Sequence, residues 1–89
     1  MSGTSKNVTI VNALGLHARS AAKIAALAGS AGSSVSICKG DRCADAADIF
    51  DLLALYCPRG TELTVRVADP GDAAVLVAIC ELIESGFGE

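Results

Sequence analysis

The sequence has no tryptophan and only two Phe and one Tyr, so aromatic side chains make up 3% of its 89 residues. A core without aromatic bulk has to be filled by Ala, Leu, Val and Ile. Long hydrophobic runs are also missing. The longest, residues 73–80, is far shorter than the roughly 20 residues of a membrane-spanning helix. The N-terminus is polar where a signal peptide would be apolar. We therefore expect a soluble cytoplasmic protein with no membrane insertion.

Basic residues are scarce as well, since 7 Lys and Arg face 10 Asp and Glu, for a net charge of -3. A nucleic-acid groove needs basic side chains to replace condensed counterions, so nucleic acid is excluded as a partner. The 52% hydrophobic fraction is too high for a disordered chain. The length leaves room for one compact core, and we expect a single domain over residues 1–89.

The four cysteines show no metal-ligand spacing and no CxxC motif, so we expect no bound metal. Cys57 follows one helical pattern and Cys80 lies inside another, as small hydrophobic residues that fill a core do. Cys38 and Cys43 flank a predicted hairpin turn that would bring them close. Thiols in the cytoplasm are normally reduced, so we expect free thiols here and keep a thiol-based sensor as a weaker alternative.

Hydrophobic periodicity predicts strands at 8–11, 35–38, 42–43 and 63–67, with a turn at 39–41. Helical spacing covers 18–28, a second segment with an apolar stripe of Ile49, Leu52, Leu53 and Tyr56, and a third segment that ends at Gly86. Asp69 is predicted to cap the third helix, with Pro70 at its first position. The order βαββαβα favours a two-layer α+β fold, with a mixed or antiparallel sheet covered by helices on one face and wet on the other.

His17 is the only histidine, and it lies between a glycine-bearing loop and the start of the first helix. Unpaired N–H groups at a helix N-terminus hold anions, and their partial positive charge favours a neutral imidazole. The Arg19 guanidinium and the Ser20 hydroxyl would add donors for phosphate oxygens. The segment therefore describes an anion site that contains a nucleophile, although an incidental surface histidine fits the same spacing.

The run Gly-Leu-His-Ala-Arg-Ser-Ala-Ala at 15–22 resembles the active-site signature of HPr, the histidine phosphocarrier of the phosphoenolpyruvate-dependent phosphotransferase system. Chain length and element order agree with that family over essentially the whole chain. Segments 12–19 and 81–89 are most similar to its nitrogen-related branch, NPr. The resemblance implies an open-faced β-sandwich, in which an antiparallel four-stranded sheet is covered on one face by three helices.

The resemblance also implies a monomeric phosphoryl carrier that is not a turnover enzyme and needs no cofactor. His17 would accept a phosphoryl group on Nδ1 from phosphorylated Enzyme I and pass it to a histidine of a downstream IIA-type protein. The Arg19 side chain, the Ser20 hydroxyl and the backbone of Ala18 and Arg19 would bind the phosphoryl oxygens. The alternative is a regulatory binding module with the same fold, which docks on partners with little or no phosphoryl relay.

Partner docking is expected around His17, on residues of the first two helices: Ala22, Lys23, Ile49, Phe50 and Leu53. Phe50 lies off the apolar stripe of the second helix, so periodicity independently predicts an exposed aromatic side chain. Leu53 fits the core equally well.

Asp48 occupies the position at which some family members carry a serine that a regulatory kinase phosphorylates. We interpret it as a helix N-cap, with partial imitation of phosphoserine as the alternative. Asp45 and Asp51 extend this acidic rim. The rim would alter electrostatic steering, which suggests partners other than the usual ones.

Overall fold

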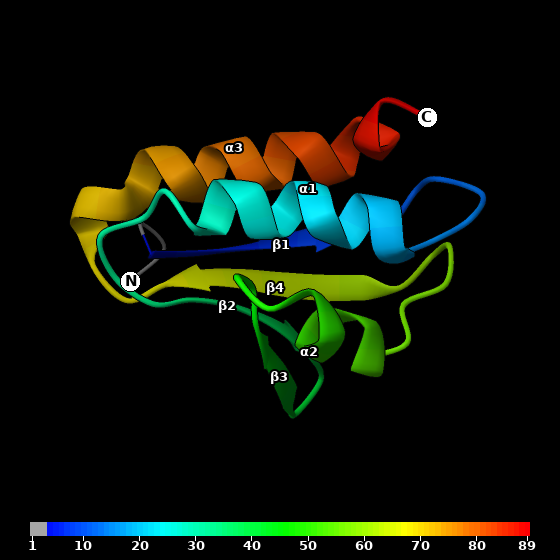
Figure 1. The fold of residues 1–89 in the computed structure, drawn as a ribbon, viewed down its shortest axis with the longest axis horizontal. Coiled ribbons are helices and arrows are strands. Elements are labelled where there is room, and N and C mark those ends of the chain that lie inside the picture. Colours follow the sequence, from blue (N-terminus) through cyan, green and yellow to red (C-terminus); the bar gives the residue numbers. More distant parts are fainter. Residues whose placement is uncertain (1–3) are drawn as a thin grey trace.

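The computed structural model describes residues 4–89, and the predicted βαββαβα order is confirmed (Figure 1). Short 3-10 turns flank the last helix. The elements are β1 (Ser5–Thr9), α1 (Ala18–Ala28), β2 (Val35–Lys39), β3 (Arg42–Asp45), α2 (Ile49–Ala54), β4 (Glu62–Val67), η2 (Pro70–Asp72), α3 (Ala73–Glu84) and η3 (Gly86–Gly88).

The sheet has the strand order β1-β4-β2-β3, and every neighbouring pair is antiparallel. All three helices lie on one face, with α1 and α3 side by side and α2 next to α1 and β3 (Figure 1). Alternation along β4 explains this layering, because Leu63, Val65 and Val67 are buried while Glu62 and Arg66 are exposed. The predicted α+β architecture, with one face of the sheet exposed to solvent, is therefore confirmed.

The core is aliphatic, as the composition predicts, and Phe87 is the one aromatic side chain buried in it. The apolar stripe of α3 is also confirmed, since Leu76, Ile79, Cys80 and Ile83 are all buried. Within residues 4–89, no helix has the length and apolar character needed to cross a membrane.

Two predicted segments have different boundaries in the structure. The first strand runs from Ser5 to Thr9, earlier than predicted, because its polar residues pair with β4 from Ser5 opposite Arg66 to Thr9 opposite Glu62. The second helix ends at Ala54, so the prediction that Tyr56 belongs to its buried stripe is wrong. Tyr56 has a positive φ of 55° and is 73% exposed.

The start of the third helix differs in a similar way. Asp69 is an N-cap, as predicted, but it caps the 3-10 turn η2 through a bond from the Gly71 amide, and α3 begins only at Ala73. Asp72 reaches across to the loop after α1, where its carboxylate accepts bonds from the amides of Gly32 and Ser33 and from the Ser33 hydroxyl. These bonds hold the pKa of Asp72 below its usual value, with the Ser33 hydroxyl as the largest cause.

The expectation of free thiols at Cys38 and Cys43 is wrong, because the two residues form a disulfide. The expectation rested on the reduced state of cytoplasmic thiols, whereas the predicted closeness of the two residues is confirmed by the strand register. Gly40 and Asp41 form a two-residue turn between β2 and β3, which sets Cys38 directly opposite Cys43. Cys57 and Cys80 are free and buried, as predicted, and burial raises the pKa of both thiols.

Candidate functional site

His17 is the N-cap residue of α1, and both its backbone and its ring take part in starting that helix. The His17 amide donates to the Ser20 hydroxyl at 2.9 Å, and the Arg19 amide donates to Nδ1 of the imidazole at 3.2 Å. These two bonds form a reciprocal capping box. The ring is thereby held against the N-terminus of α1 with the lone pair of Nδ1 facing a backbone amide.

The Ser20 hydroxyl is not available to an anion, which corrects the role predicted for it. Ser20 is fully buried, and its Oγ donates to the carbonyls of His17 and Gly15 while accepting from the His17 amide. The capping geometry explains the difference, since a side chain at this position of a capping box turns back toward the N-cap. Ser20 therefore fixes the backbone of His17 from beneath.

Glu89 contacts the other side of the imidazole ring. Its Oε2 lies 2.5 Å from Nε2 of His17, and both side chains are partly exposed, at 29% for His17 and 23% for Glu89. Since a carboxylate accepts, Nε2 carries the proton in this pair. The two contacts together select the tautomer in which Nδ1 is unprotonated, because the Arg19 amide can donate only to a free lone pair.

Asn12 holds Glu89 in place. Its Nδ2 donates to Oε1 of Glu89 at 2.9 Å and to the Gly15 carbonyl at 2.8 Å, while its buried Oδ1 has no hydrogen-bond partner among residues 4–89. The Asn12 bond is the largest cause of a lowered pKa at Glu89, and the His17 contact adds to it. One side chain thus connects the loop before α1 to the carboxylate on His17.

The loop that carries His17 is fixed by close backbone packing. Gly15 has a φ of +68°, and a Cβ at this position would lie 2.5 Å from the carbonyl oxygen of Cys57. That carbonyl accepts from the Leu16 amide at 2.8 Å. The position therefore requires glycine for its conformation and for the close approach of the segment that follows α2.

Arg19 is exposed at the start of α1, on the same depression as the imidazole. This depression has a volume of about 540 Å³ and is lined by Leu14, His17, Arg19 and Glu89. Arg19, His17 and Glu89 thus border one open space at the N-terminus of α1, where the positive charge of Arg19 and the helix N-terminus favour a small anion.

The predicted docking residues lie on α1 and α2 and differ in their exposure. Phe50 is 84% exposed, which confirms the exposure predicted from its position off the stripe. Ile49 and Leu53 are partly buried against the core, and Ala22 is exposed. Lys23 is also exposed, and its Nζ donates to the Phe87 carbonyl at 2.6 Å, which fixes η3 to α1.

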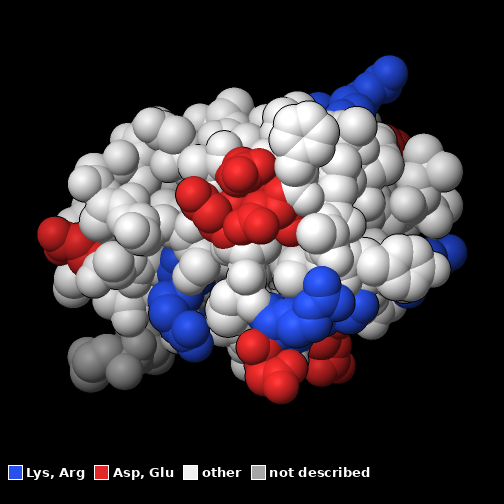
Figure 2. Space-filling model, turned by 60° about the horizontal axis from the view of Figure 1, so that its bottom comes forward, with Lys and Arg blue, Asp and Glu red and all other residues white. Residues whose placement is uncertain are grey.

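Asp48 is an N-cap, as interpreted from the sequence. Its Oδ1 accepts from the amides of Phe50 and Asp51. The neighbouring carboxylates are engaged in the same way, since Asp51 accepts from the Asp45 amide and Asp45 accepts from the Ala47 amide. Figure 2, turned toward the α2 side of the molecule, shows a compact acidic group surrounded by uncharged surface.

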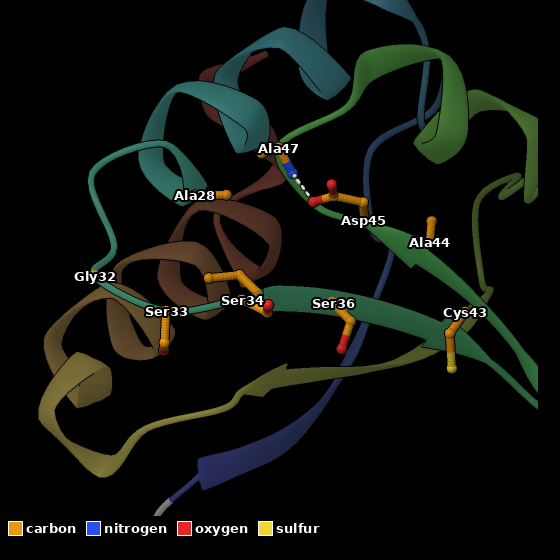
Figure 3. Close-up of a pocket in the computed structure, with 10 residues that line it drawn as sticks. Ala28, Gly32, Ser33, Ser34, Ser36, Cys43, Ala44, Asp45 and Ala47 are labelled. Carbon is orange, nitrogen blue, oxygen red and sulfur yellow. Dashed lines mark hydrogen bonds between the residues drawn. The ribbon is translucent and has the colours of Figure 1, made fainter.

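A second hollow of about 740 Å³ lies between the end of α1 and the β2–β3 hairpin (Figure 3). It is lined by three serines, by small apolar residues, by Cys43 and by Asp45, and His17 is not among its lining residues. Within residues 4–89, no group of three or more His, Cys, Asp and Glu side chains is arranged to hold a metal ion.

Sequence reasoning missed Asn12 and Glu89 as site residues. Both residues lie in segments 12–19 and 81–89, which resemble the NPr branch, but neither was assigned a role, and Glu89 lies 72 residues from His17. The chain returns to the site through η3, where Gly86, Phe87 and Gly88 all have positive φ values. The two glycines are a signal for a tight turn, but they do not specify what the turn approaches.

Comparison with known proteins gives consistent matches along the chain. The family model described as the PTS HPr component phosphorylation site matches residues 4–85. The phosphocarrier protein NPr of Shewanella violacea is 38% identical over 89 residues, which is 100% of this chain and 98% of that protein. The phosphocarrier protein HPr of Cupriavidus necator is 36% identical and covers 94% of each chain. The crystal structure of HPr-C-His from Thermoanaerobacter tengcongensis superposes with a TM-score of 0.89 at 28% identity, over 96% of both chains.

Proposed function

This chain belongs to the HPr family of phosphotransferase-system phosphocarriers, and on that premise we propose that His17 relays a phosphoryl group from phosphorylated Enzyme I to a histidine of a IIA-type protein. Proteins of this family are carriers and not turnover enzymes. The NPr-named relative supports the nitrogen-related branch. The observation that carries the proposal is the imidazole held between the Arg19 amide at Nδ1 and the Glu89 carboxylate at Nε2.

The first step is in-line attack by the Nδ1 lone pair on the phosphorus of the donor's phosphohistidine. An Nδ1–P bond forms, the donor's N–P bond breaks, and its electron pair stays on the donor nitrogen. Positive charge develops on the His17 ring while Nε2 keeps its proton. The Glu89 carboxylate stabilises that charge, in the way that a carboxylate supports the imidazolium of a catalytic triad. Transfer to the acceptor histidine is the same step with the roles exchanged.

The phosphoryl oxygens would lie at the N-terminus of α1. The Arg19 amide, which donates to Nδ1 in the unphosphorylated protein, would turn to a phosphoryl oxygen, joined by the Ala18 amide. The Arg19 guanidinium borders the same depression and supplies the opposite charge. Ser20 would act indirectly, by holding the His17 backbone through the capping box.

Docking of both partners is proposed on the surface formed by Ala22, Lys23, Ile49, Phe50 and Leu53. Exposed Phe50 supports this assignment, because a large apolar side chain in solvent is typical of an interface. HPr proteins are cytoplasmic, and we extend that compartment to this chain. We also propose that it acts as a monomer, since one chain supplies the nucleophile and its supporting groups.

A two-step relay assay tests the proposal. The protein is incubated with phosphoenolpyruvate and the organism's own Enzyme I, then separated and mixed with a candidate IIA-type protein. Intact masses follow the phosphoryl group on both proteins. The proposal predicts that the carrier gains one acid-labile phosphoryl group and loses it to the IIA-type protein. Stable phosphorylation with no transfer to any IIA-type protein of the organism would contradict the relay and favour the regulatory binding module.

A further inference from the structure

The Cys38–Cys43 disulfide lies on the sheet face that carries no helix. In β2, Ile37 is buried toward the helices, so its neighbour Cys38 projects to the opposite face. On β3, Cys43 and Ala44 alternate in the same way, and Figure 3 shows the Cys43 side chain pointing away from the side to which Ala44 points. The bond is therefore on the solvent side of the sheet, next to the edge formed by β3.

The two sulfur atoms have different surroundings. Cys43 is exposed on the edge strand, whereas Cys38 is only 5% exposed. Nη1 of Arg66 lies 3.9 Å from Sγ of Cys38. A nearby guanidinium stabilises a thiolate, and a more stable thiolate is a better leaving group in thiol–disulfide exchange. An attacking thiolate can therefore reach Cys43 Sγ, and Arg66 stabilises the Cys38 thiolate that leaves.

The residues next to the disulfide on the hairpin hold the end of α2. Lys39 follows Cys38, and its Nζ donates to the carbonyls of Leu55 and Tyr56. Arg42 precedes Cys43, and its Nη2 donates to the Ala54 carbonyl at 2.8 Å. Three successive carbonyls at the C-terminus of this short helix, which have no partner within it, are thus satisfied by two cations from one hairpin.

We propose that Cys38–Cys43 is a thiol–disulfide exchange site for a dithiol reductant, and that its redox state sets how firmly the hairpin holds α2. A thiolate of the reductant attacks Cys43 Sγ, a mixed disulfide forms, and Cys38 leaves as the thiolate beside Arg66. The second thiol of the reductant then closes its own disulfide and releases Cys43. Two electrons and two protons pass from the reductant to the protein. Disulfides in cytosolic proteins are commonly of this transient kind.

Residues 54–56, whose carbonyls bind Lys39 and Arg42, lead directly to the segment that contacts the loop of His17. After Tyr56, the Cys57 carbonyl accepts from the Leu16 amide, next to His17, and α2 itself carries the exposed Phe50. Opening the disulfide would loosen the contacts of Lys39 and Arg42. Because these contacts hold the end of α2, this helix and its proposed docking residues would become more mobile. The effect on docking rests on the proposed function, whereas the exchange chemistry and the stability of α2 do not.

The site of attack is tested on the oxidised full chain with glutathione as the probe thiol, followed by alkylation and peptide mapping. We expect glutathione on Cys43 and an alkylated thiol on Cys38. Cys57 and Cys80 are buried and do not compete. Arg66→Gln should slow opening by about threefold, while Arg66→Lys retains most of the rate and the control Arg59→Gln retains all of it. Equal or preferential attack at Cys38, or an unchanged rate in Arg66→Gln, would overturn the assignment.

Hydrogen exchange tests the coupling to α2. Amides of residues 52–56 should exchange at least about threefold faster in the reduced protein than in the oxidised protein, while amides of α3 stay the same. The Cys38→Ser/Cys43→Ser variant should match the reduced protein. Identical exchange in both redox states would contradict the coupling. These readouts need no phosphoryl donor or acceptor, so their outcome is independent of whether the phosphoryl relay exists.

Discussion

Nε2 of His17 and Oε2 of Glu89 lie 2.5 Å apart, although 72 residues separate them in the chain. Asn12 holds the other oxygen of the same carboxylate, and Lys23 fixes the preceding turn through the Phe87 carbonyl. The contact therefore belongs to a network from three parts of the chain. Its chemical consequence is a ring whose Nε2 is protonated and whose Nδ1 keeps its lone pair, which accepts from the Arg19 amide.

Replacing this carboxylate is predicted to slow phosphoryl transfer. Glu89→Gln removes the charge that stabilises the developing imidazolium, so the rate of His17 phosphorylation should fall on the order of tenfold. Rapid-quench measurements with phosphorylated Enzyme I give the rate, and nitrogen NMR of the ring reports the tautomer. The matched control is Glu84→Gln, whose carboxylate pairs with Lys6 away from the site. An unchanged rate together with an unchanged tautomer would remove Glu89 from the mechanism.

Replacing Gly15 with alanine is predicted to destabilise the fold for two separable reasons. Gly15→Ala forces a positive φ on alanine and places a methyl group against the Cys57 carbonyl, so it should cost about 3 kcal/mol of unfolding free energy. Gly40→Ala shares the positive φ, at +62°, but meets nothing within 4 Å, and should cost about 1 kcal/mol. Urea unfolding measures both values. Equal losses would show that the close approach to Cys57 does not matter.

Asp72 gives the fold a predictable pH dependence. Its pKa is lowered in the folded state, chiefly by the Ser33 hydroxyl, so its stabilising effect is complete above the unfolded pKa. That effect is lost as pH falls through the lower folded value. Asp72→Asn should therefore melt a few degrees below the parent at pH 7, and the gap should close in the acid range below about pH 4. Calorimetry across pH checks this, with Glu81→Gln on exposed α3 surface as the control. A difference in melting temperature that persists at low pH would contradict this role of Asp72 in the pH dependence of stability.

The two interpretations of Asp48 predict different kinetics. As an N-cap it should tolerate Ser, while Asp48→Ala should lose about 1 kcal/mol of unfolding free energy. The capping interpretation also predicts that Asp48→Ser accepts a phosphoryl group from Enzyme I at the parent's rate. A clearly faster rate in Asp48→Ser, at unchanged stability, would instead support partial imitation of phosphoserine.

The sequence was sufficient for the layer architecture because its signals are local. Alternation at Leu63, Val65 and Val67 and the helical spacing of Leu76, Ile79 and Ile83 each determine which face is buried. Tyr56 is a residue for which helical spacing predicts the wrong environment. Its position extends the stripe of α2, but Lys39 and Arg42 of the neighbouring hairpin bind the carbonyls at the end of the helix and the chain turns away.

The candidate site was only partly predictable for the same reason. The His17 position at a helix start follows from nearby residues, as does the capping role of Asp48. The burial of Ser20 depends on capping geometry, and the contact of Glu89 depends on a turn at the far end of the chain. The disulfide was missed for a different reason, because the predicted hairpin already brought Cys38 near Cys43 and the expectation of free thiols rested on the reducing cytoplasm. The contact between Glu89 and His17 spans 72 residues, and long-range pairing leaves no periodic signal.

The most direct measurement of the central claim is identification of the atom that carries the phosphoryl group. The full chain is incubated with phosphoenolpyruvate and the organism's own Enzyme I, and nitrogen and phosphorus NMR spectra are recorded beside those of His17→Ala. We predict one acid-labile phosphoryl group, bonded to Nδ1 of His17 and absent from the variant. Phosphate on Nε2, phosphate that persists in His17→Ala, or no phosphate at all with an Enzyme I that phosphorylates another carrier would contradict it.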